Sequence, residues 1–297
     1  MIVGKRKSAL ALLLSVHGSV LPRVLPGILA IAAFSAVVVW IDRHVHALVH
    51  ADAASFAVFG IALSLFLGFR NNAAYERWWE GRRLWGQLIA DSRALGRESE
   101  IFLAAPEARA QLVRLMLAFL HLHRLNLRRQ PADPAALVWT EPGFLDTPHP
   151  PCAPLDAMAE LLRAEQAAGR LDGFGARALA ERLGAITLAQ AGCERIATTP
   201  LPYVYSLLVF RTAVLYCLLS PLGLIESAGW LTPLFAAVIA YVFFGLFEVT
   251  RELEDPFGET PNSLALNAMC RVVEISLMPR LGLPAPAPMQ PEGDFLA

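Results

Sequence analysis

Residues 53–69 read AASFAVFGIALSLFLGF, and the run RNNAAYERWWEGRRLWG follows directly at residues 70–86. At 1.5 Å per residue the apolar stretch makes about 25 Å of helix, close to the hydrocarbon thickness of a bilayer. Arginines and aromatic residues together are typical of the boundary between lipid and water. The pattern therefore predicts a helix that crosses a membrane and continues into water beyond Phe69.

Three further stretches are similarly apolar. They are residues 24–41 (VLPGILAIAAFSAVVVWI), residues 203–224 with the single charge Arg211, and residues 230–247 (WLTPLFAAVIAYVFFGLF). Charge-poor runs of this length are typical of membrane-spanning helices. The sequence therefore predicts an all-α, multi-pass membrane protein whose four transmembrane helices form two hairpins, 24–41 with 53–69 and 203–224 with 230–247.

The composition supports this class of protein. Of the 297 residues, 56% are hydrophobic and 17% are charged, with a mean hydropathy of +0.48, whereas soluble domains average about 25% charged residues. The net charge of −1 argues against a nucleic-acid partner, which requires a basic surplus. No P-loop, HExxH, GxSxG or GxGxxG motif occurs, so we expect neither an enzyme nor a cofactor or metal site.

Positive charges are distributed unevenly around the apolar stretches. The ends expected to face the cytoplasm carry Lys5, Arg6, Lys7, Arg23, Arg70, Arg77, Arg82, Arg83, Arg182, Arg195 and Arg251. The loop after the first stretch has only Arg43, and the loop after the third has no Lys or Arg. Because Lys and Arg accumulate on the cytoplasmic side, we expect an inner (plasma) membrane protein with both termini in the cytoplasm.

The chain divides accordingly into four parts. Residues 1–72 hold an N-terminal amphipathic segment and the first two spans, 73–200 a cytoplasmic helical domain, 201–278 the last two spans and a following cytoplasmic helix, and 279–297 a flexible, proline-rich tail. Within the cytoplasmic domain, helical periodicity predicts helices at 75–100, 108–128, 155–168 and 174–196, with a proline-rich connector at 130–154.

The second span has two distinct rows of residues at a spacing of four. The small row consists of Gly60, Ser64 and Gly68, and the bulky row beside it of Ala57, Ile61, Leu65 and Phe69. Small residues allow helices to approach closely in lipid. If several copies surround an axis, the bulky row forms a narrow apolar neck that can gate ions by dewetting. The alternative is that this row faces lipid or a neighbouring helix.

Four segments together resemble the bestrophin family in its bacterial form. They are FLGFRNNAAYERWWEGRRLWG at 66–86, HGSV at 17–20, CERIATTPLP at 193–202 and DPFGE at 255–259. The resemblance extends over about residues 7–279 and preserves the order of the segments. It implies a homopentameric ion channel with one axial pore.

The resemblance also implies particular roles. The neck is lined by Ile61, Leu65 and Phe69, and Ile186, beside Leu179 and Leu183, is the favoured residue for a second, cytoplasmic constriction. The resemblance implies that the permeant ions are small and monovalent. Bacterial relatives favour cations, whereas animal members conduct chloride and other anions. The acidic run that helps animal members bind calcium is missing after Glu259.

Two other functions remain open from the residues alone. Asp42, His46 and His50 share a helix face if the first span continues, and could then hold a metal ion in a membrane metal-binding protein or enzyme. The chain could instead be a non-conducting membrane scaffold. Arg211 needs a partner inside the membrane, and Glu248 is the candidate that the sequence offers.

Overall fold

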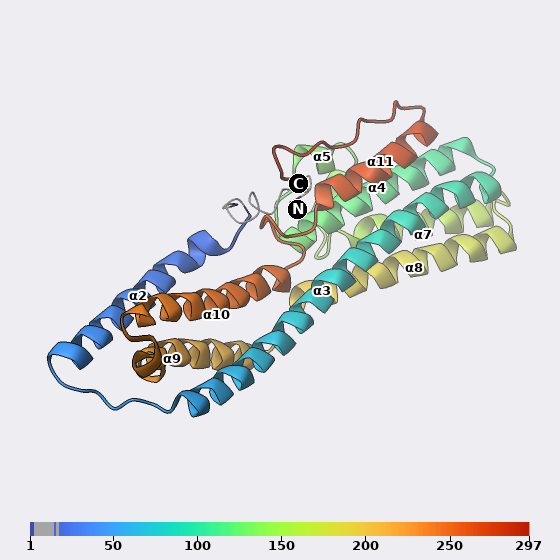
Figure 1. Ribbon diagram of the computed structural model, residues 1–297. Helices are drawn as coiled ribbons and strands as arrows, with labels where there is room; N and C mark the ends of the chain where they lie inside the picture. The colour runs from blue at the N-terminus through green and yellow to red at the C-terminus, as the bar shows by residue number, and fades with distance from the viewer. Residues whose placement is uncertain (3–14, 16–17, 297) are drawn as a thin grey trace. The chain divides into compact units, whose positions relative to one another are not determined.

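The computed structural model describes residues 1–2, 15 and 18–296 (Figure 1). These residues are mostly helical, and their extended pairing is limited to isolated backbone bridges from Phe295 to Ile2 and Glu292. The amphipathic segment expected around Lys5–Lys7 lies outside the described residues. The helices are α2 (Leu21–His44), α3 (Ala53–Phe102), α4 (Pro106–Arg128), α5 (Pro134–Leu137), α6 (Pro142–Leu145), α7 (Cys152–Ala167), α8 (Gly173–Thr198), α9 (Tyr203–Ala228), η1 (Gly229–Leu231), α10 (Thr232–Glu254), α11 (Leu266–Leu277) and η2 (Met278–Leu281).

The described chain forms two compact units. The apolar unit comprises residues 18–78 and 200–255, and the polar unit comprises residues 79–199 and 256–296 with residues 1 and 2. Helix α3 supplies residues to both units as one uninterrupted helix, as the sequence predicted for the run after Phe69.

The apolar unit contains the four predicted hydrophobic stretches: 24–41 lies in α2, 53–69 in α3 and 203–224 in α9, and 230–247 begins in η1 and continues in α10. Helical stretches long and apolar enough to cross a membrane are 21–44, 56–102 and 203–254. The last of these contains α9 and α10, which pack against each other on either side of the short η1. Helix α10 also packs along α2. The structure therefore has the apolar helices of a membrane protein.

Small residues allow these helices to approach closely. Ala236 and Ala240, one turn apart on α10, are completely buried. A methyl group added at Gly27 of α2 would lie 3.3 Å from the Phe244 ring of α10. Around these contacts the core is formed by Val24, Ile28, Ile31, Leu63, Leu67, Val209, Ala213, Tyr216, Cys217 and Phe243. The unit is thus packed in the way that membrane helices usually associate.

The polar unit is organised around α4. Fifteen residues of this helix are buried, because α7, α8, α11 and η2 all pack on it. The helices expected at 108–128, 155–168 and 174–196 are confirmed as α4, α7 and α8. The proline-rich connector contains the one-turn helices α5 and α6, and Asp133 caps α5 by accepting a hydrogen bond from the Ala136 amide at 2.9 Å.

The tail after η2 contacts the first residues of the chain. The Leu296 amide donates a hydrogen bond to the Met1 carbonyl at 2.9 Å, and Ile2 forms a bridge with Phe295. These contacts describe the arrangement of the tail, and its expected flexibility stays a prediction.

His123 of α4 is a buried, uncharged histidine in the polar unit. Its ring stacks between Trp85, at 5.8 Å, and Phe119, at 5.5 Å, and its side chain has no exposed surface. Burial lowers the pKa of His123 from 6.5 to about 3, and His149 acts in the same direction. The Glu194 carboxylate, 4.0 Å away, does not offset this cost.

His123 should therefore make the stability of the protein depend on pH. Below about pH 6.5 the unfolded chain protonates this residue and the folded chain does not, so stability falls by up to about 1.4 kcal/mol per pH unit until the folded pKa is reached. We expect His123→Phe to take up about one proton fewer on unfolding, so that its stability depends less steeply on pH. The measurement is the free energy of unfolding in detergent between about pH 6 and pH 4.

The exposed His46 provides the matched control, because His46→Gln removes a histidine that remains in solvent. This variant should keep the wild-type slope. An unchanged slope in His123→Phe would contradict the assignment of a buried neutral imidazole.

Candidate functional site

The part of α3 in the apolar unit is buried along a single narrow stripe. The stripe consists of Gly60, Leu63, Leu67, Arg70 and Ala74, all of which are buried. The last four are at most 3% exposed. Because α3 packs through this stripe, its position fixes which residues of the helix face away from the rest of the protomer.

The large residues of the bulky row lie on the opposite side. Ile61, Leu65 and Phe69 are 64%, 57% and 63% exposed. With about 100° of rotation per residue, their mean direction is about 180° from that of the buried stripe. The three side chains therefore point away from the body of the protomer, to be covered by lipid or by other copies of the chain.

The small row lies between these two faces, and the structure places its members differently. Gly60 is buried against Tyr216 of α9, whose hydroxyl group would collide with a methyl group added to the glycine. Ser64 donates a hydrogen bond to the Gly60 carbonyl at 2.8 Å and is exposed. A methyl group at Gly68 would meet nothing within 4 Å. Of the three residues in the small row, only Gly60 takes part in helix packing within the described protomer.

Two tyrosines of α9 hold the first half of α3. The Tyr216 ring stacks on Phe56 at 4.3 Å and makes an edge contact with Phe243 of α10 at 5.3 Å. Nearer the other end of the span, the Tyr205 hydroxyl donates a hydrogen bond to the Phe66 carbonyl at 3.0 Å. Tyr216 is therefore fixed on several sides and packs directly over Gly60.

A charged contact holds α3 just after the neck residues. The Arg70 side chain is 2% exposed, and its Nη2 donates to Glu254 of α10 at 3.1 Å. Its guanidinium carbon lies 4.5 Å from the centre of the Phe247 ring. Nearby, Arg77 Nε donates to the Glu254 carbonyl at 2.8 Å. A buried arginine must keep its partners, so Arg70 resists rotation of α3.

The face that carries the bulky row continues with polar residues. Asn72 and Glu76 are exposed and follow Phe69 at helical spacing. A charge thus lies on the same face as the apolar residues, about two turns after the last of them.

The residues suggested for a second, cytoplasmic constriction lie on α8 and are mostly buried. Ile186 and Leu179 of α8 are completely buried in the protomer, and Leu183 is partly buried. A side chain without exposed surface cannot line an aqueous constriction in this geometry, so Ile186 has no support from the structure in that role.

The structure does not place Asp42, His46 and His50 on one helix face, as the metal-site alternative required. Helix α2 ends at His44, so His46 and His50 do not continue its face. Asp42 does accept a hydrogen bond from His50 at 3.0 Å and one from the Leu48 amide at 2.8 Å. Across the residues that the structure describes, no group of three or more His, Cys, Asp or Glu side chains is placed to hold a metal ion.

The suggested pair of Arg211 and Glu248 is wrong. Glu248 lies 3.4 Å from Arg23 of α2 and 3.7 Å from Arg251. Arg23 also bonds to Glu252. Arg211 is on an exposed face of α9, and no ion pair joins it to another described residue.

A bundle of long apolar helices, with an exposed apolar row on the helix that continues into a polar unit, defines a helical membrane protein. The family model described as "Bacterial/Fungal Bestrophin protein" matches residues 1–279. The chain therefore belongs to the bacterial and fungal bestrophin family, in agreement with the four sequence segments that suggested it.

Relatives and solved structures agree with this membership. A voltage-dependent anion channel-forming protein of Mesorhizobium japonicum is 45% identical, over 99% of this chain and 96% of its own. The similarly named YneE of Escherichia coli is 38% identical, over 88% of each chain. A crystal structure of a bacterial bestrophin homologue from Klebsiella pneumoniae has a TM-score of 0.81 at 30% identity, over 89% of this chain and 99% of that one.

The residues that orient α3 are not among those that the sequence pattern indicated. Tyr216, Phe247 and Glu254 lie on α9 and α10, more than a hundred residues away in sequence. Only one signal was available, namely an arginine directly after an apolar span, which needs an acidic partner if it is buried. Which acid supplies the partner could not be read from spacing.

The contact between Gly60 and Tyr216 predicts a large effect of a single methyl group. Gly60→Ala should lower the free energy of unfolding by about 1–3 kcal/mol, because Tyr216 is fixed by Phe56 and Phe243 and cannot move aside. The measurement is thermal unfolding of the detergent-solubilised protein.

Gly245 of α10 is the matched control in the same unit, since a methyl group there meets nothing within 4 Å. Gly245→Ala should leave stability unchanged or raise it by up to about 1 kcal/mol. Equal losses in both variants would show that the close approach at Gly60 does not matter.

Proposed function

We propose that the chain is one subunit of a homopentameric ion channel in the inner membrane, with α3 around a central axis. The observation that carries this proposal is the direction of Ile61, Leu65 and Phe69, opposite to the stripe by which α3 packs in its own protomer. Copies arranged around an axis would bring these side chains into three successive apolar rings.

An apolar neck controls ion passage through water. A narrow ring of Ile, Leu or Phe gives a permeant ion no hydrogen-bonding partner and favours local dewetting, which raises the barrier to ions. Ser64 and Gly68 lie beside this face and remain uncovered in one protomer. Their small side chains would let neighbouring copies of α3 approach closely.

The topology in this proposal has four spans. Helices α2, α9 and α10 and the first part of α3 cross the membrane, so that both termini and the polar unit are cytoplasmic. The arginines that follow Phe69 then lie at the inner boundary, as the distribution of positive charge requires. A non-conducting scaffold is the rival function, and it would need no aligned apolar row.

The permeant species are small monovalent ions. Relatives of this chain are named voltage-dependent anion channel-forming proteins, whereas the resemblance to bacterial bestrophins favours cations. The neck carries no charge and favours neither sign. We assign the preference to charged residues at its ends, of which Glu76 shares the face of the neck and favours cations.

Widening the neck tests the proposed function. Leu65→Ala removes apolar atoms from the middle ring and should raise ion flux several-fold, because a wider neck is easier to wet. The measurement is planar-bilayer recording of the purified protein.

Leu234→Ala is the matched control, because Leu234 of α10 is 59% exposed in the protomer, against 57% for Leu65. This substitution on another helix should leave the current unchanged. Absence of current from both the wild type and Leu65→Ala would favour the scaffold, and equal effects of both substitutions would place the Leu65 side chain against lipid.

Neutralising Glu76 tests the origin of selectivity. Glu76→Gln should lower the permeability to potassium relative to chloride, because it removes the negative charge that attracts cations to the end of the neck. The reversal potential under a potassium chloride gradient should shift towards the chloride equilibrium potential.

The exposed Glu107, at the start of α4, supplies the control. Glu107→Gln makes the same change of charge on a different helix, in the polar unit, and should leave the reversal potential where it is in the wild type. A wild-type reversal potential at the chloride value would contradict the assigned cation preference.

A further inference from the structure

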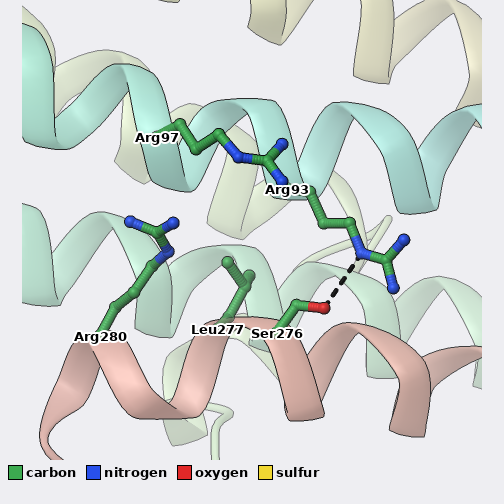
Figure 2. A pocket seen from close by; sticks show the side chains of 5 residues that line it. All are labelled: Arg93, Arg97, Ser276, Leu277 and Arg280. Atoms are coloured by element: carbon green, nitrogen blue, oxygen red, sulfur yellow. Dashed lines mark hydrogen bonds between the residues drawn. The ribbon is translucent and has the colours of Figure 1, made fainter.

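A cavity of about 220 Å³ in the polar unit is lined mainly by arginines (Figure 2). Arg93 and Arg97 come from α3, Ser276 and Leu277 from α11, and Arg280 from η2. No carboxylate lines this cavity. It is thus a concave, positively charged site formed by residues other than those assigned to the neck.

The arginines are held in place by neighbouring groups. Arg93 Nε donates to the Ser276 hydroxyl at 3.0 Å, as Figure 2 shows, and Ser276 in turn donates to the Val272 carbonyl at 3.1 Å. This contact uses the Nε of Arg93 and leaves its two terminal amino groups without a hydrogen-bond partner among the described residues. The guanidinium is therefore oriented and still able to bind.

Gly96 brings the third arginine into the site. A methyl group on Gly96 would lie 2.8 Å from Leu277 and 3.1 Å from Arg280 Nε, so only glycine allows η2 to lie this close to α3. Arg280 Nη1 donates to the Gly96 carbonyl at 3.1 Å and pairs with Glu100. Arg280 is thereby held at Gly96, which lies between Arg93 and Arg97 on α3.

The charges in the cavity are incompletely neutralised. Glu100 compensates Arg280, but no ion pair joins Arg93 or Arg97 to any described residue. These two arginines are four residues apart on one helix face, where like charges repel. Their proximity is unfavourable by itself and becomes favourable when an anion lies between them.

We propose that this cavity binds a phosphate group, as inorganic phosphate, pyrophosphate or the phosphate of a small ester. Guanidinium groups form paired hydrogen bonds with phosphate oxygens, and a phosphate dianion matches the two uncompensated charges. The cavity has the volume of about seven water molecules and is smaller than the roughly 300–1,000 Å³ of sites for larger ligands. A compact phosphate group is therefore the ligand that fits.

Calorimetric titration of the full-length protein in detergent with inorganic pyrophosphate tests this site. The wild type should bind in a saturable manner, and Arg97→Gln and Arg93→Gln should each weaken binding at least about tenfold, the loss expected for one charge-assisted contact. Arg97 has no ion pair to lose and its side chain is exposed, so this variant should fold normally.

Arg177→Gln is the matched control, since Arg177 is an exposed arginine of the same unit whose ion pair, within the described part of the chain, is with Glu181. It should bind pyrophosphate like the wild type. Absence of saturable binding by the wild type would overturn the proposal, and so would equal affinities of the wild type, Arg93→Gln and Arg97→Gln.

A second titration distinguishes a soluble ligand from a lipid headgroup. Mixed micelles with phosphatidic acid are added to the pyrophosphate complex, and micelles with phosphatidylcholine alone serve as the reference. Displacement by phosphatidic acid alone would identify a phosphomonoester headgroup as the source of the phosphate. Retained pyrophosphate would identify a soluble ligand.

Discussion

The rotation of α3 about its own axis is the constraint on which the functional interpretation depends. Two contacts hold it from opposite ends of the span: Tyr216 against Gly60, and Glu254 with Phe247 around Arg70. A turn of the helix by one residue, about 100°, would move Arg70 away from Glu254 and push a larger side chain against Tyr216. The bulky row faces outward because the opposite face is fixed so firmly.

The fixed rotation of α3 also explains why the residues of its small row differ in burial. Gly60 serves packing within the protomer, whereas Ser64 and Gly68 are left uncovered by it. In lipid there is little hydrophobic drive for helices to associate, so close van der Waals packing and polar contacts decide the arrangement. Ala236 and Ala240 of α10 are likewise completely buried in the core of the apolar unit, where their small side chains allow close helix packing.

The polar unit follows different rules, because water competes for its polar groups. Its core is a central α4 enclosed by helices, and several of its charges are paired, as in Arg182 with Asp91 and Glu98. Arg93 and Arg97 lack an ion pair among the described residues and line the same cavity. Stability alone gives no reason to place like charges around one cavity, so they point to a ligand.

The sequence alone determined the helical class, the apolar stretches, the uninterrupted α3 and the family, because hydropathy, helical spacing and short motifs are local properties. It also indicated the bulky row, since residues four apart must share a helix face. Only the tertiary structure decided which face of α3 is buried, which acid pairs with Arg70, that Ile186 is enclosed and that α2 ends before His46. Those outcomes depend on contacts between residues far apart in the chain, and a pattern along one segment contains no information about the partner it will meet.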